Sequence, residues 1–201
     1  MKDGKGFVKE YDNNGKLLFE GEYLNGKGNG KEYEYFGELI FEGEYSNGKR
    51  NGKGKEYDED SGNLIFEGRY LNGERNGKGK EYYNGKLEFE GEYLNGKRNG
   101  KGKEYYKDGN VEFEGEYLNG KRWNGKGKEY NYDGELIFEG EYLNGKRNGK
   151  GKEYYDNGKI SFEGEYLNGE RNGKGKEYNN GGKLVFEGEY LKGKKNGEGK
   201  E

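Results

Sequence analysis

This chain has few of the side-chain types that act as nucleophiles or as general acids and bases. It has no histidine or cysteine, and its only serines are Ser46, Ser61 and Ser161. The usual pairings of a nucleophile with a base therefore cannot be assembled, and soft or borderline metals lack their preferred ligands. Carboxylates are abundant, but they recur identically along the chain, whereas a catalytic site breaks such symmetry. We expect no enzymatic activity, no cofactor, no bound metal and no small-molecule substrate.

Basic side chains offer binding chemistry instead. Lys-Arg pairs recur before Asn-Gly, so a row of cations could contact phosphates, an anionic membrane or an acidic protein partner; the alternative is that they are solvated loop charges. No Ser or Thr follows these lysines and no helix is predicted, which excludes a nucleotide-binding phosphate loop. The net charge of -3 and the pairing of lysine with glutamate argue against nucleic acid. The candidate contacts are Lys49, Arg50, Lys97, Arg98, Lys121, Arg122, Trp123, Lys146 and Arg147.

These residues lie in a repeated unit. The motif Phe-Glu-Gly-[Glu/Arg]-Tyr recurs eight times, 22 to 25 residues apart, beginning at Phe19, Phe41, Phe66, Phe89, Phe113, Phe138, Phe162 and Phe186. A period this short predicts a stack of small units that bury their apolar faces against their neighbours. We expect one array over residues 1–201 of about eight units, with partial units at 1–18 and 186–201.

The unit resembles a known repeat. Phe138-Glu-Gly-Glu-Tyr142, Asn144-Gly145 and Gly149-Lys-Gly151 are similar to the MORN repeat, and the joint Tyr154-Tyr-Asp-Asn-Gly-Lys159 looks like the MORN variant of bacterial antitoxin-like proteins. The chain departs from the family in having Tyr or Phe where Trp is common, and one extra residue in the joint. The resemblance implies an all-β fold of tandem hairpins. It also implies roles in scaffolding, dimerisation, cytoskeletal or ciliary assembly, phospholipid binding by basic loops, or neutralisation of a partner.

The first strand of each unit carries the predicted core. Strand side chains alternate between faces, so Leu136, Phe138, Gly140 and Tyr142 should share one face. We expect the aliphatic residue two positions before each Phe to belong to this core, and the rings to cover bare glycine backbone. The predicted core comprises Phe41, Gly43, Tyr45, Phe89, Gly91, Tyr93, Phe113, Gly115, Tyr117, Phe138, Gly140, Tyr142, Phe162, Gly164 and Tyr166.

Short connections set the topology. We expect a six-residue loop, Asn144–Gly149, to lead into a second strand in which Gly151 pairs with Tyr142 and Lys152 faces Glu141. The Asn-Gly of Asp156–Lys159 predicts a tight hairpin turn. Strands joined only by such reversals form an antiparallel meander, which we expect to be an elongated, twisted, open, solenoid-like rod. One long edge should carry the basic loops, and the other should be acidic.

For two recurring residues, the sequence does not decide which face of the sheet they occupy or what they bind. Simple alternation places the recurring Tyr of Lys-Glu-Tyr, such as Tyr154, opposite the glycines, unless a bulge turns it inward. It also places the preceding glutamate, such as Glu153, on the aromatic face. In one interpretation these glutamates form hydrogen bonds with Tyr hydroxyls or with solvent. In the other they form a row of acids that binds a basic ligand.

Irregular segments interrupt the period. Asn25–Lys31 is two residues short, and Trp123 is an insertion that either fills a bulge or anchors a partner. The acidic joint Asp58–Asn63 lacks the spacing of a calcium loop, so we interpret it as a solvated turn. Both ends stop in mid-unit, which predicts end-to-end self-association or a fragment of a longer array.

The function that follows is binding. No apolar run is long enough to span a membrane and no signal-peptide core opens the chain, so we expect a cytoplasmic protein that could lie at a membrane periphery. We expect a non-catalytic scaffold that binds protein partners or its own copies through an extended β surface. The alternatives are a peripheral anionic-phospholipid-binding module that uses the basic edge, and an antitoxin-like neutraliser.

Overall fold

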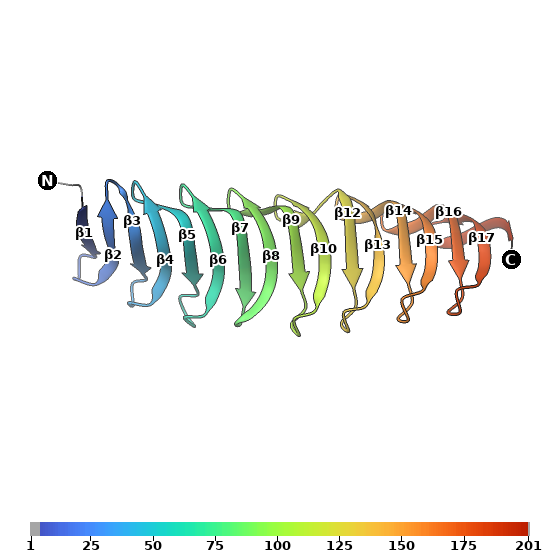
Figure 1. The fold of residues 1–201 in the computed structure, drawn as a ribbon, viewed down its shortest axis with the longest axis horizontal. Helices are drawn as coiled ribbons and strands as arrows, with labels where there is room; N and C mark the ends of the chain where they lie inside the picture. The colour runs from blue at the N-terminus through green and yellow to red at the C-terminus, as the bar shows by residue number, and fades with distance from the viewer. Residues whose placement is uncertain (1–4, 201) are drawn as a thin grey trace. The chain divides into compact units, whose positions relative to one another are not determined.

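The computed structural model describes residues 5–200, and this part of the chain contains strands and no helix. The chain divides into two compact units, Met1–Arg98 and Asn99–Glu201. Within each unit the strands lie side by side in chain order (Figure 1). The prediction of an all-β hairpin fold is confirmed.

Eighteen strands make up the described part of the chain. The first unit contains β1 (Lys5–Tyr11), β2 (Leu17–Leu24), β3 (Lys27–Tyr33), β4 (Leu39–Ser46), β5 (Lys49–Tyr57), β6 (Leu64–Leu71), β7 (Glu74–Tyr83) and β8 (Lys86–Leu94). The division between the units falls within β9 (Lys97–Tyr105). The second unit continues with β10 (Val111–Leu118), β11 (Lys121–Arg122), β12 (Gly125–Tyr130), β13 (Leu136–Leu143), β14 (Lys146–Tyr154), β15 (Ile160–Leu167), β16 (Glu170–Tyr178), β17 (Leu184–Leu191) and β18 (Lys194–Lys200).

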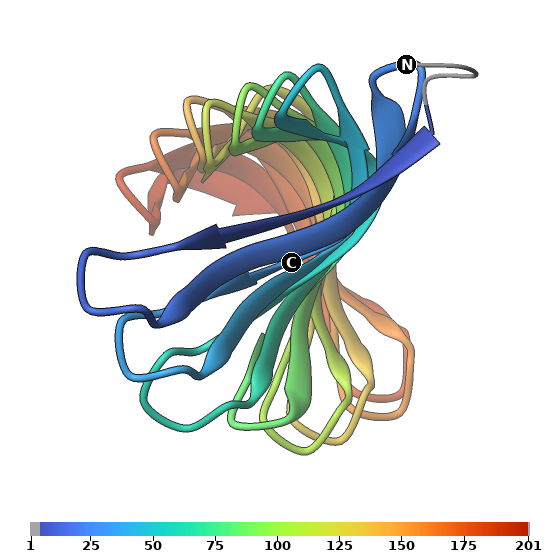
Figure 2. The ribbon, with the colours of Figure 1, turned by 90° about the vertical axis from the view of Figure 1, so that its left-hand side faces the viewer.

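Within each unit, strands that follow one another in the chain pair antiparallel. The pairs run from β1–β2 to β7–β8 in the first unit, and from β12–β13 to β17–β18 in the second. The two-residue β11 interrupts one hairpin, so β10 pairs with both β11 and β12. The antiparallel meander is therefore present in each unit, and the strands of each unit are visibly twisted and curved (Figure 2).

The core of each unit consists of one Phe and one Tyr per hairpin. Phe138 is 0% exposed and Tyr142 is 6% exposed. The buried apolar residues of the described chain are Phe41, Tyr45, Phe66, Tyr70, Phe89, Tyr93, Phe113, Tyr117, Phe138, Tyr142, Phe162, Tyr166, Phe186 and Tyr190. Phe and Tyr alternate with residues of the opposite face, as the period of two requires.

The prediction of a six-residue loop at Asn144–Gly149 is wrong. Asn144 and Gly145 have φ angles of 52° and 75°, so these two residues alone make the turn and β14 begins at Lys146. A two-residue turn with both φ angles positive matches the twist of the flanking strands. The following Asn148-Gly149 lies within β14, where the register with β13 shifts between Gly140 and Tyr142. The second Asn-Gly is therefore a bulge rather than part of a loop.

The shorter turn changes the register that we expected. Gly151 pairs with Gly140 rather than with Tyr142, and Tyr142 lies opposite Arg147. Lys152 consequently faces Glu139 rather than Glu141. Two glycines thus lie side by side in the middle of each regular hairpin.

The other edge has wider turns than predicted. The residues between β14 and β15 are Tyr155–Lys159, closed by a bond of 2.9 Å from the Tyr155 N–H to the Lys159 carbonyl. Gly158 has a φ of 75°, which explains the glycine of the Asn-Gly pair. A two-residue Asn-Gly turn does occur at Asn84-Gly85, where Tyr83 pairs with Lys86.

The aliphatic residues two positions before each Phe are not in the core. A register shift between Glu129 and Tyr130 places Leu136 opposite Tyr130, while Phe138 lies opposite Glu129. One residue of β13 is thus unpaired at this step, and the alternation that linked Leu136 to Phe138 is broken. Leu136 is only half-buried.

Candidate interaction surface

Each buried Phe ring lies over a pair of glycines. A Cβ placed on Gly140 or on Gly151 would lie 2.6 Å from Cζ of Phe138, closer than any real Cβ contact. On Gly151 it would also lie 3.1 Å from Cε2 of Tyr166, in the next hairpin. The Phe138 and Tyr166 rings meet edge to face, with centroids 5.3 Å apart. The ring of one hairpin therefore needs both its own glycines and the tyrosine of the next hairpin.

An arginine lies over six of the seven buried Phe rings, and Lys195 lies over Phe186. The Cζ atom of Arg147 lies 4.0 Å from the centroid of Phe138, within the range of a cation–π contact. The same contact occurs for Arg50, Arg75, Arg98, Arg122 and Arg171 with Phe41, Phe66, Phe89, Phe113 and Phe162, at 4.1 to 4.4 Å. The arginine stem thus adds apolar cover to a core that has only one layer.

The same arginines join glutamates of successive hairpins into a ladder, here called the Arg–Glu ladder. Arg171 binds Glu153 through Nη2 and Glu177 through Nη1, the latter at 3.0 Å. The ladder of the first unit contains Glu32, Arg50, Glu56, Arg75, Glu81 and Arg98. That of the second contains Glu129, Arg147, Glu153, Arg171, Glu177 and Lys195.

Three glutamates of the ladder, Glu32, Glu129 and Glu153, also accept hydrogen bonds from core tyrosines. The Tyr166 hydroxyl donates to Glu153 Oε1 at 2.7 Å, and Tyr45 donates to Glu32 at 2.6 Å. Glu153 therefore lies on the aromatic face, as alternation predicted, and of the two interpretations the hydrogen-bonded one is confirmed. These carboxylates are occupied by Tyr and Arg rather than held ready for a basic ligand.

This pairing makes Glu32, Glu129 and Glu153 stronger acids. Partial burial raises the pKa of Glu129, but hydrogen bonds from Arg147 and Tyr142 outweigh it, and the net pKa lies below its ordinary 4.5. The pKa of Glu153 is lowered against burial by Arg171 and Tyr166 in the same way. Glu32 shows the same balance with Arg50 and Tyr45.

The ladder predicts a loss of stability in acid. A carboxyl whose pKa is lower in the folded state stabilises the protein above its unfolded pKa, and this contribution disappears as the pH falls through the folded pKa. We expect the urea midpoint to be nearly constant from about pH 7 to pH 5 and to fall steadily below about pH 4.5. Urea titrations followed by circular dichroism at each pH would measure it. A midpoint that stays constant down to about pH 3 would contradict this role of the ladder.

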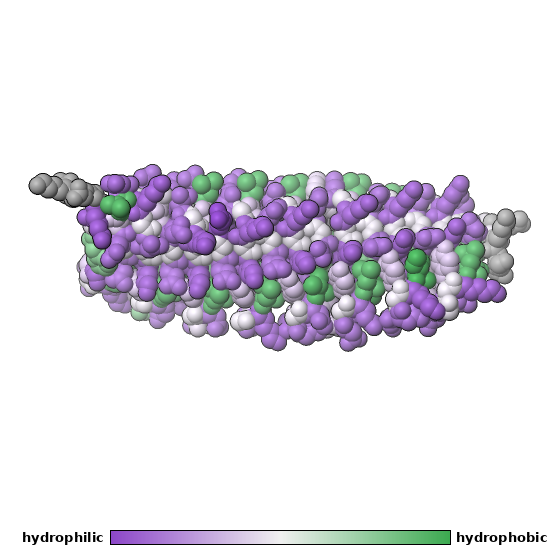
Figure 3. Space-filling view, in the orientation of Figure 1, coloured by the Kyte–Doolittle hydropathy of each residue, from purple (hydrophilic) through white to green (hydrophobic). Residues whose placement is uncertain are grey.

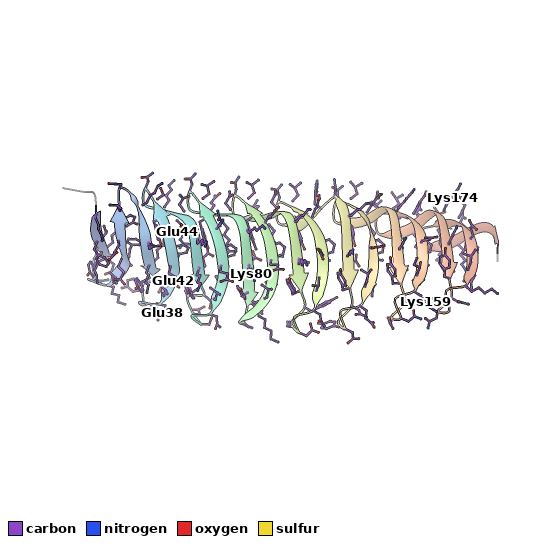
Figure 4. All side chains as sticks on the ribbon, viewed as in Figure 1. Glu38, Glu42, Glu44, Lys80, Lys159 and Lys174 are labelled. Atoms are coloured by element: carbon purple, nitrogen blue, oxygen red, sulfur yellow. The ribbon has the colours of Figure 1, made fainter. Side chains whose placement is uncertain are left out.

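The opposite face is polar and self-neutralised. Glu139 lies between Lys128 of β12 and Lys152 of β14, and Glu163 lies between Lys152 and Lys176. In the first unit Glu42 and Glu44 project from one side of β4, while Glu38 lies at the wider-turn end of that strand (Figure 4). Alternating charges along this face offer no large field of one sign.

The recurring Tyr of Lys-Glu-Tyr belongs to this polar face. The Tyr154 hydroxyl donates to Glu139 Oε1 at 2.6 Å, and Tyr57 makes the same bond of 2.8 Å to Glu42. Partial burial, followed by the hydrogen bond to Glu42, raises the pKa of Tyr57 to about 12. The bulge does not turn this Tyr inward; it displaces the aliphatic residue of the following strand instead.

The predicted basic contacts separate into two groups. Arg50, Arg98, Arg122 and Arg147 are half-buried and paired with glutamates, so the structure does not present them as a free cationic row. Their lysine neighbours Lys49, Lys97, Lys121 and Lys146 are exposed and begin strands beside the Asn-Gly turns. Sequence reasoning missed this division because it placed both residues in one loop.

A row of exposed leucines escaped the sequence analysis. In five hairpins an exposed leucine follows a buried Tyr just before the turn, so alternation places it on the polar face, where Leu143 pairs with Lys146. Leu71, Leu94, Leu167 and Leu191 are 50%, 50%, 50% and 51% exposed, and Leu143 is 45% exposed. Apolar side chains recur at intervals along the edges of the strands (Figure 3). Alternation from Tyr142 could have revealed this row.

Two of the irregular segments have local backbone or side-chain bonds. Trp123 lies in the break between β11 and β12, is half-buried, and donates its backbone N–H to the Glu116 carbonyl at 2.8 Å. In the acidic joint, Asp58 Oδ1 accepts bonds from the N–H and hydroxyl of Ser61 at 2.9 and 2.6 Å. Among the described residues no group of acidic side chains has a metal-binding arrangement.

No helix in the described part of the chain has the length and apolar character needed to cross a membrane. The comparison with curated proteins gives no relative for this chain.

Family models match most of the sequence. The MORN repeat model matches residues 41–62, 66–86, 89–111, 138–160, 162–183 and 186–201, and the MORN repeat variant matches residues 8–25. These segments contain the Phe–Gly–Tyr strands and Asn-Gly turns described above, and they leave out the hairpin with the Trp123 insertion. Because the matched segments cover more than half of the sequence, the chain belongs to the MORN repeat family.

Proposed function

We propose that this protein is a non-catalytic scaffold that binds protein partners along the polar face of its repeats. The observation that carries the proposal is the leucine row: the same side chain, half-exposed, stands at the same place in successive hairpins. Half-exposed apolar side chains repeated in register give a partner the same apolar contact at successive hairpins. A repeated surface also allows one partner to engage several hairpins at once, which strengthens binding without strengthening any single contact.

The aromatic face supports the same proposal because much of it is engaged within the chain. Glu153, for example, binds Arg171 and Tyr166, and Phe138 and Phe162 are 0% exposed. The chemistry that could act on a substrate is thus repeated and internally paired. The polar face and its leucine row are left to meet a partner.

A second candidate is a peripheral module for anionic membranes. Lys97, Lys121 and Lys146 are exposed beside the leucine row, and basic residues next to apolar ones are typical of membrane-surface proteins. Glu74 and Glu170 take the place of lysine in two hairpins and weaken this candidate.

Affinity purification from the native host, compared between the wild-type chain and one variant, tests the proposal. The variant carries Leu71→Thr, Leu94→Thr, Leu143→Thr and Leu167→Thr, which keep a strand-favouring residue at exposed sites. We expect a protein that co-purifies in fixed stoichiometry with the wild-type chain and is lost with the variant. Co-sedimentation of both proteins with anionic vesicles tests the second candidate. A partner retained equally by both proteins would contradict the proposed surface.

A further inference from the structure

The leucine row of the second unit has a regular composition. Cross-strand pairs place Leu118 beside Lys121, Leu143 beside Lys146, Leu167 beside Glu170 and Leu191 beside Lys194. Apolar and charged side chains therefore alternate along the hairpin tips, with three lysines and one glutamate. The row therefore has a leucine on every second strand, and its charged residues carry a net positive charge.

The spacing of the row is fixed by backbone contacts between the hairpin tips. The Gly169 N–H donates to the Arg147 carbonyl at 2.9 Å, and the Gly193 N–H donates to the Arg171 carbonyl at 2.9 Å. The tips at Gly169 and Gly193 are thus each bonded to the preceding tip, two strands away. Leucines two strands apart are separated by roughly 9.6 Å, twice the spacing of neighbouring strands.

This separation is close to the repeat of an amphipathic helix. Seven helical residues rise roughly 10.5 Å, so a helix with an apolar residue once per heptad places its side chains nearly in step with the leucines. A helix satisfies its own backbone hydrogen bonds and needs only side-chain contacts from the row. Acidic residues beside the apolar stripe would face Lys121, Lys146 and Lys194.

We propose that the leucine row binds an acidic amphipathic helix of a partner protein, laid across the hairpin tips with one apolar residue per hairpin. This inference rests on the proposed scaffold function and specifies its partner. Two other occupants fit less well. A second copy of the chain would bring the same lysines against the row. A membrane surface has no apolar groups held at the spacing of the leucines, whereas Glu141 and Glu165 beside the row already lie opposite Lys126 and Lys150.

A designed peptide tests the fit with the full chain. The probe has four heptads of Ala, Glu and Gln with one leucine per heptad, and is labelled for fluorescence anisotropy. The first comparison peptide has the same composition with its leucines spread around the helix. The second has lysine in place of glutamate. We expect saturable binding of the probe alone, weakened severalfold when the salt concentration rises from about 50 to 200 mM.

Variants locate the binding. The triple change Leu143→Thr, Leu167→Thr and Leu191→Thr should weaken binding roughly a hundredfold, because each leucine would lose its burial against the helix. The change of Lys121, Lys146 and Lys194 to Gln should weaken it and reduce the salt dependence. Leu184→Thr at the opposite edge, where Leu184 is 40% exposed, is the matched control and should bind like the wild type.

Each outcome separates this inference from the proposed function. Equal binding of the probe and the first comparison peptide, or no loss in the leucine variant, would overturn the helix proposal. If the probe does not bind while a host protein still co-purifies in a leucine-dependent way, the helix is wrong and the scaffold stands. Leucine-dependent binding to vesicles of three parts phosphatidylcholine and one part phosphatidylserine, without peptide binding, would overturn both.

Discussion

Replacing Phe138 with alanine is expected to destabilise the second unit by about 3–5 kcal/mol, the usual cost of deleting a fully buried aromatic ring. The ring is 0% exposed and lies between the Gly140–Gly151 pair and the Arg147 guanidinium. Its loss would also remove the edge contact to Tyr166 of the next hairpin. Urea unfolding followed by the fluorescence of Trp123, the one tryptophan of the chain, reports on this unit.

Phe19 provides a matched control in the same sequence motif. Its hairpin is two residues short, contains no arginine, and leaves Phe19 only half-buried. We expect Phe19→Ala to cost about 1–2 kcal/mol, measured by circular dichroism because Trp123 lies in the other unit. Equal losses at Phe19 and Phe138 would show that the arginine cover adds nothing to the core.

Replacing Gly151 with alanine is expected to destabilise the protein by about 1–3 kcal/mol, although alanine is an ordinary strand residue. The new methyl group would lie 2.6 Å from Cζ of Phe138 and 3.1 Å from Cε2 of Tyr166, so both buried rings would have to move. Gly151 has no positive φ, and the cost therefore comes from the rings rather than from backbone strain. Thermal unfolding of the variant would measure it.

Gly6→Ala is the control for this change. Gly6 also lies in a strand, β1, and a Cβ placed there meets no atom within 4 Å. We expect Gly6→Ala to be neutral or slightly stabilising, because alanine restricts the unfolded chain. A Gly151→Ala variant as stable as wild type would mean that the ring does not rest on the glycine pair.

The sequence predicted the strands, the buried rings and the glycines beneath them because these follow directly from a period of two within a repeat of 22 to 25 residues. It could not predict which Asn-Gly makes the turn. Asn144-Gly145 and Asn148-Gly149 carry the same signal, and the first became the turn while the second became a bulge. Placing both in one six-residue loop displaced the register of Gly151 and put Lys146 and Arg147 in that loop.

The Arg–Glu ladder was hidden for the same reason. Side chains no longer alternate regularly between the two faces of a strand that contains a bulge. Counting back from Tyr154 along the strand therefore could not show that Arg147 lies on the same face as Phe138. The leucine row, in contrast, follows from simple alternation beyond Tyr142 and was within reach of the sequence. Its exposure became evident only when the turn was known to occupy two residues.

We expect the arginine, the Phe ring and the glycine pair to form one cooperative unit in each hairpin that has all three, as Arg147, Phe138 and Gly140–Gly151 do. A double-mutant cycle between Phe138→Leu and Arg147→Met, followed by urea unfolding, tests it most directly. The 4.0 Å contact between the guanidinium and the ring predicts a coupling energy of about 0.5–2 kcal/mol. Two changes that add within about 0.3 kcal/mol would contradict the account, because the arginine would then stabilise the protein independently of the ring it covers.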